Sequence, residues 1–245
     1  MRRFFAERER CRGQTIELDE AESQHLAQVL RTQTGERVTV LDGAGGIFEC
    51  AVEKIAKRHV TLTILDRQRA APLPYDLTLF QAIPKGKIMD GIVQKATELG
   101  ARRIVPLLTE RTIVDIDADS AKVDKWRDVA IESIKQCGSP WLPKIDRPIK
   151  FNEALKQVGS FALVASLHAG AKEIDQFFKV QRPSEIQIWV GPEGDFTPAE
   201  VDALVSAGAH PITLGPLVLR CDTAAVCSLA LAAHWRRRSL RNPEA

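Results

Sequence analysis

The sequence lacks a long apolar run. No stretch approaches the roughly 18 consecutive apolar residues that a helix needs to cross a bilayer. The opening residues, MRRFFAERER, are positively charged, but no apolar segment of signal-peptide length follows them. We therefore predict a cytoplasmic protein that has no membrane-spanning segment.

Cysteine is scarce, and no metal motif accompanies it. The five cysteines are an odd number, so they cannot all pair within one chain. None forms a CxxC pair, no histidine lies near them at zinc-finger spacing, and no HExxH occurs. We expect reduced thiols in a reducing compartment and no metal site.

Three familiar catalytic or nucleotide-binding motifs are also missing. The chain contains no GxxxxGK[ST], no GxGxxG between a strand and a helix, and no GxSxG. The first two absences argue against the usual phosphate cradles. The third argues against a serine-hydrolase nucleophile elbow.

The composition is that of a globular protein, with 44% hydrophobic and 27% charged residues. The net charge of +2 says little about partners, but arginines gather at both ends of the chain. Guanidinium groups suit phosphate, so both clusters are candidate RNA contacts. The second cluster equally fits the last turn of a helix, where cations complement the helix dipole. The clusters are Arg2, Arg3, Arg8, Arg10 and Arg12, and Arg236, Arg237, Arg238 and Arg241.

The first seventy or so residues indicate a small β-rich unit. Two strand-like runs surround the Asp42-Gly43 turn signal within residues 35–55, and a third follows at 59–66. Residues 18–31 show helical spacing in Leu26, Val29 and Leu30, with Asp19 as the expected cap. Two prolines within residues 68–76 indicate a linker. We place a first domain at residues 1–72.

After residue 75, short apolar strands alternate with helical segments. Strands are predicted at 76–83, 102–108, 161–167, 186–190 and 211–214. Helices are predicted at 89–99, 124–137 and 224–238, and helical segments follow the later strands. Such alternation predicts an α/β domain, residues 73–245, with a mostly parallel sheet and helices on both faces.

Three loops stand at the carboxyl ends of predicted strands, where ligands bind in open α/β sheets. They are residues 166–170, 191–196 and 214–223. Each has a simple structural interpretation. Thr197 to Glu200 is a capping box with Pro198 at the first helical position, and Asp222 or Thr223 would cap the last helix. The glycines of these loops would nevertheless let a ligand approach the backbone closely.

Five ordered segments carry a resemblance to a known family. They are RRFF (2–5), HLAQVLR (25–31), QKATELGARRIVPLLTERTIV (94–114), WVGPEGDFT (189–197) and LGPLVLRCDTAA (214–225). Together they closely resemble the RsmE-type 16S ribosomal RNA uracil-N3 methyltransferases of the SPOUT superfamily, over nearly the whole chain.

The resemblance implies a specific fold and activity. Residues 1–72 would form a PUA-like RNA-binding β-barrel, and residues 73–245 a SPOUT methyltransferase domain with a C-terminal trefoil knot. The knot would hold S-adenosylmethionine (SAM) and lie in a homodimer interface. The substrate would be a uridine of the decoding region of 16S rRNA, in the 30S subunit, methylated at N3.

The resemblance also implies roles for individual residues. Arg220 would stabilise negative charge on the uracil carbonyl oxygens, and Asp222 or bulk water would accept the N3 proton. Because the sulfonium already activates the methyl group, no metal is required. The RNA contacts would be Arg2, Arg3, Arg31, Lys85, Lys87 and Arg111. The cofactor-binding residues would be Leu167, His168, Gly170, Gly191, Pro192, Glu193, Gly194, Leu214, Gly215, Leu219, Cys221, Thr223 and Ala224.

The chain departs from the family pattern at several positions. Leu217 stands where an arginine is usual, Cys221-Asp222 where Thr-Glu is usual, and Ser139 where an arginine often follows the glycine. The missing arginines keep two alternatives open. One is a SPOUT enzyme acting on a ribose 2′-O or another base, and the other is an inactive RNA-binding relative.

Overall fold

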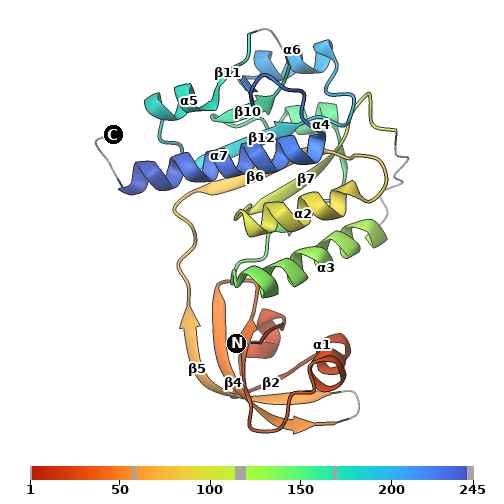
Figure 1. Cartoon of the computed structure of the whole chain (residues 1–245), viewed down its shortest axis with the longest axis vertical. Helices are drawn as coiled ribbons and strands as arrows, with labels where there is room; N and C mark the ends of the chain where they lie inside the picture. Colours follow the sequence, from red (N-terminus) through yellow and green to blue (C-terminus); the bar gives the residue numbers. More distant parts are fainter. Residues whose placement is uncertain (1, 57–58, 114–119, 168–169, 242–245) are drawn as a thin grey trace. The chain divides into compact units, whose positions relative to one another are not determined.

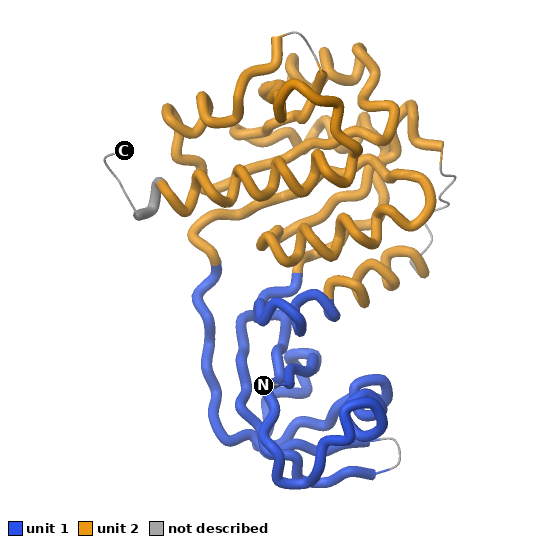
Figure 2. The backbone as a smooth tube through the Cα atoms, viewed as in Figure 1, with its two compact units in different colours: residues 1–72, 131–142 blue, residues 73–130, 143–245 orange. Residues whose placement is uncertain are grey.

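The computed structural model describes residues 2–56, 59–113, 120–167 and 170–241. The chain forms two compact units (Figure 2). Unit 1 comprises Met1–Pro72 and Ile131–Leu142, and unit 2 comprises Leu73–Ala130 and Pro143–Ala245. Unit 1 therefore contains a segment, residues 131–142, that the predicted domain 1–72 did not include.

Unit 1 is built on a five-stranded sheet of order β1-β3-β4-β5-β2. Neighbouring strands are antiparallel except for the parallel pair β1–β3. Alternate residues of the central strands, among them Val40, Cys50 and Leu62, are fully buried in one core. The three predicted strands are confirmed as β3, β4 and β5, whereas the short β1 and β2 were not predicted. The strands are β1 (Arg3–Phe5), β2 (Thr15–Glu17), β3 (Arg37–Leu41), β4 (Gly46–Ile55) and β5 (Val60–Arg69).

The helix of unit 1 is irregular. A short 3-10 turn, η1 (Arg8–Cys11), precedes it, and α1 (Glu20–Gln24) begins where predicted, with the Asp19 side chain accepting a 2.8 Å hydrogen bond from the Glu22 N–H. It continues as a π-helical turn, η2 (His25–Val29). The predicted helical spacing is confirmed, and within it Leu26 is fully buried whereas Val29 is 71% exposed. A π-turn holds more residues than an α-turn, which moves Val29 off the buried face.

Residues 139–142 dock onto the turn between β3 and β4. The Gly45 N–H donates to the Pro140 carbonyl at 2.9 Å, and the Leu142 N–H donates to the Gly43 carbonyl at 2.9 Å. The Trp141 ring lies directly against Gly45, where an added Cβ would come within 2.5 Å of the ring. Gly45 also has a φ of +95°. Both the backbone conformation and the contact with Trp141 therefore require glycine at this position.

A buried ion pair ties the same segment to α1. Lys135 and Glu22 are each 7% exposed, and the Lys135 ammonium contacts the carboxylates of Glu22 and, at 2.6 Å, of Glu132. Burial raises the pKa of the Glu22 carboxyl, although the hydrogen bond and charge of Lys135 oppose that shift. Arg3 caps the end of α3 (Ser120–Cys137) by donating to the Lys135 and Gln136 carbonyls, each at 3.1 Å.

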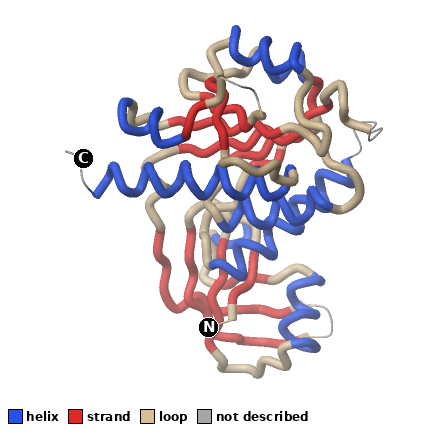
Figure 3. The backbone as a smooth tube through the Cα atoms, turned by 45° about the horizontal axis from the view of Figure 1, so that its top comes forward, coloured by secondary structure: helices blue, strands red, loops and turns tan. Residues whose placement is uncertain are grey.

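Unit 2 is built on a parallel sheet (Figures 1 and 3). Its strand order is β11-β13-β10-β12-β6-β7-β8, with β9 also pairing with β7, and every pairing is parallel as predicted. The predicted strands are confirmed, while the two-residue strands β8, β9 and β11 were not predicted. The strands are β6 (Asp76–Ala82), β7 (Arg103–Leu108), β8 (Lys144–Ile145), β9 (Ile149–Lys150), β10 (Ala162–Ala165), β11 (Lys172–Glu173), β12 (Glu185–Val190) and β13 (His210–Thr213).

Helices cover both faces of this sheet. α4 and α6 pack on the face that carries Phe80 and Trp189, whose rings stack with centroids 4.0 Å apart. Residues of the opposite face, such as Leu79 and Ile188, are also fully buried, and α7 packs against α2, β6 and β12. The helices of unit 2 are α2 (Ile88–Glu98), the first part of α3, α4 (Phe151–Leu155), α5 (Ile174–Val180), α6 (Pro198–Ser206) and α7 (Cys221–Arg241).

Each of the five cysteines is a free thiol. Burial raises the pKa of Cys11 and of Cys50 to about 12, which keeps both protonated and unreactive in the core of unit 1. Among the described residues, no helix is both long enough and apolar enough to cross a membrane.

A matched pair of glycine substitutions tests the docking of Trp141. Gly35 and Gly45 both have a positive φ, but nothing lies within 4 Å of a Cβ added at Gly35. We expect Gly35→Ala to lower the free energy of unfolding by about 1 kcal/mol through backbone strain alone. We expect Gly45→Ala to lower it by roughly 2–4 kcal/mol because the contact with Trp141 is also lost. Urea denaturation measures both, and equal effects would show that the Trp141 contact does not matter.

Candidate functional site

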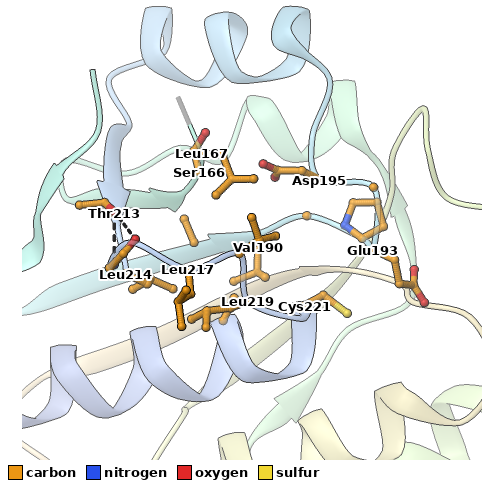
Figure 4. Close-up of a pocket in the computed structure, with 17 residues that line it drawn as sticks. Ser166, Leu167, Val190, Glu193, Asp195, Thr213, Leu214, Leu217, Leu219 and Cys221 are labelled. Carbon is orange, nitrogen blue, oxygen red and sulfur yellow. Dashed lines mark hydrogen bonds between the residues drawn. The ribbon is translucent and has the colours of Figure 1, made fainter. Parts of the chain in front are cut away.

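A pocket opens at the carboxyl ends of β10, β12 and β13 in unit 2 (Figure 4). Its volume is about 200 Å³, more than ten times the roughly 10–15 Å³ that one water molecule needs. Three segments line it, and each begins at the last residue of a strand. They are Ala165–Leu167, Val190–Asp195, and Thr213–Gly215 with Leu217–Leu219, Cys221 and Ala224.

The rim of the pocket is unusually apolar for an exposed surface. Leu167, Leu217 and Val218 are 65%, 74% and 78% exposed. Exposed aliphatic side chains gathered around a concave site are typical of a ligand-binding pocket. The arrangement suits a flat apolar or aromatic group that would cover these side chains.

Two glycines shape the pocket for different reasons. Gly191 is buried, and a Cβ there would lie 2.7 Å from the Phe196 nitrogen and 2.9 Å from the Asp195 Oδ1. Only glycine lets the two backbone segments approach so closely. Gly215 faces open space, but its φ of +118° is one that residues with a side chain rarely adopt.

The turn after β12 is fixed from within and by the helix that follows. The Asp195 N–H donates to the Pro192 carbonyl at 2.9 Å, and the Asp195 Oδ1 accepts from the Phe196 N–H at 2.7 Å. The predicted capping box is confirmed. The Thr197 N–H donates to Glu200 at 2.9 Å, and the Glu200 N–H donates to the Thr197 hydroxyl at 3.3 Å.

Neighbouring strand ends hold the same turn from the side. The Lys85 N–H donates to the Glu193 carboxylate at 2.9 Å, and the Arg111 guanidinium donates to the Gly194 carbonyl. The fully buried Gln81 side chain donates to the Gly191 carbonyl at 3.4 Å. The loops after β6 and β7 therefore help to set the position of the pocket wall.

The third segment runs from β13 into α7. Its residues 214–220 form no helix or strand, so their backbone N–H and C=O groups do not take part in the regular hydrogen bonds of a helix or a sheet. α7 begins at Cys221, and the Ala224 N–H donates to the Arg220 carbonyl at 2.8 Å. The expectation that Asp222 or Thr223 caps this helix is therefore wrong. Both lie in the first turn, because the helix starts earlier than its alanine-rich run indicated.

Cys221 brings a buried thiol to the pocket. Burial raises the pKa of this thiol, and the negative charge of Glu193 raises it further. The thiol is therefore protonated at neutral pH and acts as a small apolar wall rather than as a nucleophile.

Most of the predicted cofactor-binding residues line the pocket. Gly170 and Thr223 do not line it, and neither do the predicted catalytic residues Arg220 and Asp222. His168 lies outside the described residues. Residues that do line it are Leu167, Gly191, Pro192, Glu193, Gly194, Leu214, Gly215, Leu219, Cys221 and Ala224.

The prediction also missed several lining residues. Ala165, Val190 and Thr213 are the last residues of β10, β12 and β13, and this position was the signal that could have found them. Asp195 follows the glycines of its loop but was not assigned a role. Ser166, Leu217 and Val218 also line the pocket, and they belong to the loops 166–170 and 214–223 that were predicted to meet a ligand.

The predicted RNA contacts fall into two groups. In unit 2, Lys85, Lys87 and Arg111 are exposed, and two of them contact the turn at 193–194. In unit 1, Arg31 is exposed with a φ of +50°.

Other basic residues that were predicted to contact RNA form contacts within the protein or are buried. Arg2 donates to the Thr32 hydroxyl at 2.6 Å and lies 3.5 Å from the Glu36 carboxylate. Arg3 caps α3 as described above. Arg236, from the C-terminal cluster, is only 6% exposed, so the expectation that the whole cluster is open to RNA is wrong for this residue.

The chemistry of the pocket fits SAM. Its exposed aliphatic rim suits an adenine ring, its glycine-bearing turns offer backbone groups, and Asp195 offers a carboxylate to a cation. Within the described ranges, no group of three or more His, Cys, Asp or Glu side chains is placed to hold a metal ion.

Comparison with protein families agrees with this chemistry. Residues 71–233 match a family described as an RNA methyltransferase domain. Residues 18–65 match one described as an RNA methyltransferase PUA domain. The first match covers well over half of the chain.

Individual relatives are similar to this chain over most of its length. The chain is 33% identical to ribosomal RNA small subunit methyltransferase E of Synechocystis sp., covering 88% of this chain and 72% of that protein. It is 30% identical to the protein of the same name from Aquifex aeolicus, covering 95% and 99%.

Two solved structures share the fold. One is a putative methyltransferase from Legionella pneumophila in complex with bound SAM (TM-score 0.87, 31% identity, covering 94% of this chain and 95% of that one). The other is ribosomal RNA small subunit methyltransferase E from Neisseria gonorrhoeae bound to SAM (TM-score 0.85, 30% identity, covering 96% and 97%). This chain therefore belongs to the ribosomal RNA small subunit methyltransferase E family, whose members are SAM-dependent methyltransferases.

Proposed function

We propose that this protein transfers a methyl group from SAM to N3 of a uridine in the decoding region of 16S rRNA in the 30S subunit. The observation that carries the proposal is the apolar-rimmed pocket at the carboxyl ends of β10, β12 and β13. The resemblance of the whole chain to relatives whose names specify small-subunit rRNA supports the substrate class.

The pocket residues would bind and orient the methyl donor. SAM, when bound, supplies a methyl group that its positive sulfur makes electrophilic. Leu167, Leu217 and Leu219 would enclose the adenine, and the backbone of the 191–194 turn would fix its polar edge. Correct alignment of two reactants is worth up to about 7–11 kcal/mol in favourable cases, so a rigid pocket supplies much of the catalysis.

Arg220 and Asp222 would act on the uridine. Arg220 is exposed and immediately precedes Cys221 at the pocket wall, so an RNA base can reach it. Its guanidinium would stabilise the negative charge that develops on the uracil carbonyl oxygens as N3 loses its proton. Asp222, half-buried in the first turn of α7, or bulk water would accept that proton. The base must be unpaired or flipped out because N3 takes part in Watson–Crick pairing.

The remaining basic residues and unit 1 would hold the RNA. Lys85, Lys87 and Arg111 are exposed on loops next to the 193–194 turn, where they would meet phosphates beside the target base. The PUA-like unit 1, with Arg31 exposed, would bind another part of the RNA.

We further infer a knotted chain and a homodimer. β13 pairs with β10 toward one edge of the sheet, yet α7, which follows it, packs against β12 and β6 nearer the centre. The chain must therefore cross back past β10 between Gly215 and Arg220. The family resemblance supports both the trefoil knot, of which this crossing would be a part, and the dimer.

Two positive-φ glycines test the pocket. Gly215 (φ +118°) lines it, whereas Gly208 (φ +103°) lies in the α6–β13 turn, and neither has a neighbour within 4 Å of an added Cβ. Alanine at either position should cost about 1–3 kcal/mol of stability through backbone strain. Only Gly215→Ala should weaken SAM binding, by about tenfold or more, because the strained loop leaves its binding conformation. Calorimetric titration of the full chain measures this, and equal SAM affinities of the two variants would contradict the pocket assignment.

Arg220 is tested by separating binding from turnover. We expect Arg220→Ala to lower the rate of methyl transfer into 30S subunits by about 10²–10³-fold, the usual effect of removing an oxyanion donor. Its affinity for SAM should stay unchanged because Arg220 does not line the pocket. Unaltered turnover would refute the role of Arg220.

The modified nucleoside identifies the reaction. Mass spectrometry of nucleosides from the treated rRNA should find 3-methyluridine, whereas a 2′-O-methyl nucleoside would indicate the other specificity. Label transfer from radioactive SAM distinguishes an active enzyme from an inactive RNA-binding relative. Normal turnover of Asp222→Asn would leave bulk water as the proton acceptor.

A further inference from the structure

The pocket wall contains one carboxylate whose negative charge is not explained by the fold. Asp195 lines the pocket and is half-buried. Its φ of +61° lies in the left-handed region, where a residue with a side chain is less stable than glycine. The hydrogen bond from the Phe196 N–H to Oδ1 supports this conformation, but it requires only an acceptor oxygen, which asparagine would also supply. The negative charge of Asp195 is therefore not needed to form the turn.

The Asp195 carboxylate is anchored at the pocket wall. Its Oδ1 accepts the Phe196 N–H at 2.7 Å and would lie 2.9 Å from a Cβ on Gly191. In Figure 4 the side chain points toward Leu167, into the pocket, whereas the other lining carboxylate, Glu193, points away from it. Glu193 is also exposed and accepts a hydrogen bond from the Lys85 N–H.

No cation of the described chain forms an ion pair with Asp195. The nearby Arg111 guanidinium donates to the Gly194 carbonyl instead. The charge of Asp195 therefore remains available to whatever fills the pocket. Because Coulomb attraction grows as two charges approach and as solvent is excluded, a half-buried carboxylate that points into the pocket acts more strongly on a ligand charge than an exposed one that points away.

We propose that Asp195 makes the pocket selective for the charge of the methyl donor. This inference rests on the proposed function, in which the pocket binds SAM. SAM carries a positive sulfonium, whereas the product, S-adenosylhomocysteine, carries a neutral thioether and lacks the transferred methyl group but is otherwise the same molecule. A carboxylate on the pocket wall raises the affinity for the positively charged donor above that for the neutral product. Methyl transfer therefore lowers the affinity of the pocket for the cofactor that it holds and promotes product release.

The decisive variant is Asp195→Asn. Asparagine keeps the size and the acceptor oxygen for the Phe196 N–H, and it tolerates a positive φ, so the melting temperature should stay unchanged. We expect its affinity for SAM to fall by about tenfold, while its affinity for S-adenosylhomocysteine changes by less than about twofold. Calorimetric titration of the full chain with each compound measures both, without RNA or turnover.

Two controls sharpen the test. Glu193→Gln removes a carboxylate that is exposed and turned away, so it should change the ratio of the two affinities much less than Asp195→Asn does. High salt should lower the ratio of the two affinities of the wild-type chain, since screening weakens the attraction of a partly exposed charge. The same ratio for Asp195→Asn should not depend on salt.

Each result decides the question. Equal losses of affinity for both compounds in Asp195→Asn would overturn the inference and assign Asp195 a hydrogen bond to a group that the two compounds share. Unchanged affinity for both would overturn it as well. Failure of the wild-type chain to bind SAM would overturn the proposed function, and the inference with it.

Discussion

The pocket depends on the close approach of two backbone segments at Gly191. The strand β12 ends there, and the chain turns back so tightly that the Phe196 nitrogen occupies the space of a side chain. This contact sets where Glu193, Gly194 and Asp195 stand, and the capping box of α6 keeps the far side of the turn in place. The loops after β6 and β7 then fasten to the turn through Lys85 and Arg111. The close approach at Gly191 thus brings the ends of three strands, β12, β6 and β7, into one wall of the pocket.

Much of this architecture could be predicted from residue patterns. Buried strands at 76–83, 161–167 and 186–190 and the capping box at Thr197 were predicted because apolar runs and caps are local signals. The site was located for a similar reason, since ligands gather where parallel strands end. The match to the family added the cofactor and the reaction, which composition and periodicity do not specify.

What the patterns missed depends on long-range contacts. Val29 shares the helical spacing of Leu26 and Leu30, and the π-turn in which it is exposed has no sequence signal of its own. The sequence suggested that three arginines of the terminal clusters are free to bind RNA. Arg2 and Arg3 instead hydrogen-bond residues far away in the sequence, and Arg236 is buried by tertiary packing. The start of α7 was placed too late because an arginine and a cysteine are ordinary residues at a helix terminus, with no preference that marks it.

The discontinuity of unit 1 affects how the protein is made. Its N-terminal part leaves the ribosome first, but the tryptophan that lies against Gly45 and the lysine that pairs with Glu22 are more than sixty residues further along the chain. A nascent or truncated chain that stops at residue 72 would therefore lack the ring that covers Gly45 and would leave the Glu22 carboxylate without its counterion. During synthesis the first unit is completed only after about a third of the second has been translated, so the two units cannot mature in simple order along the chain.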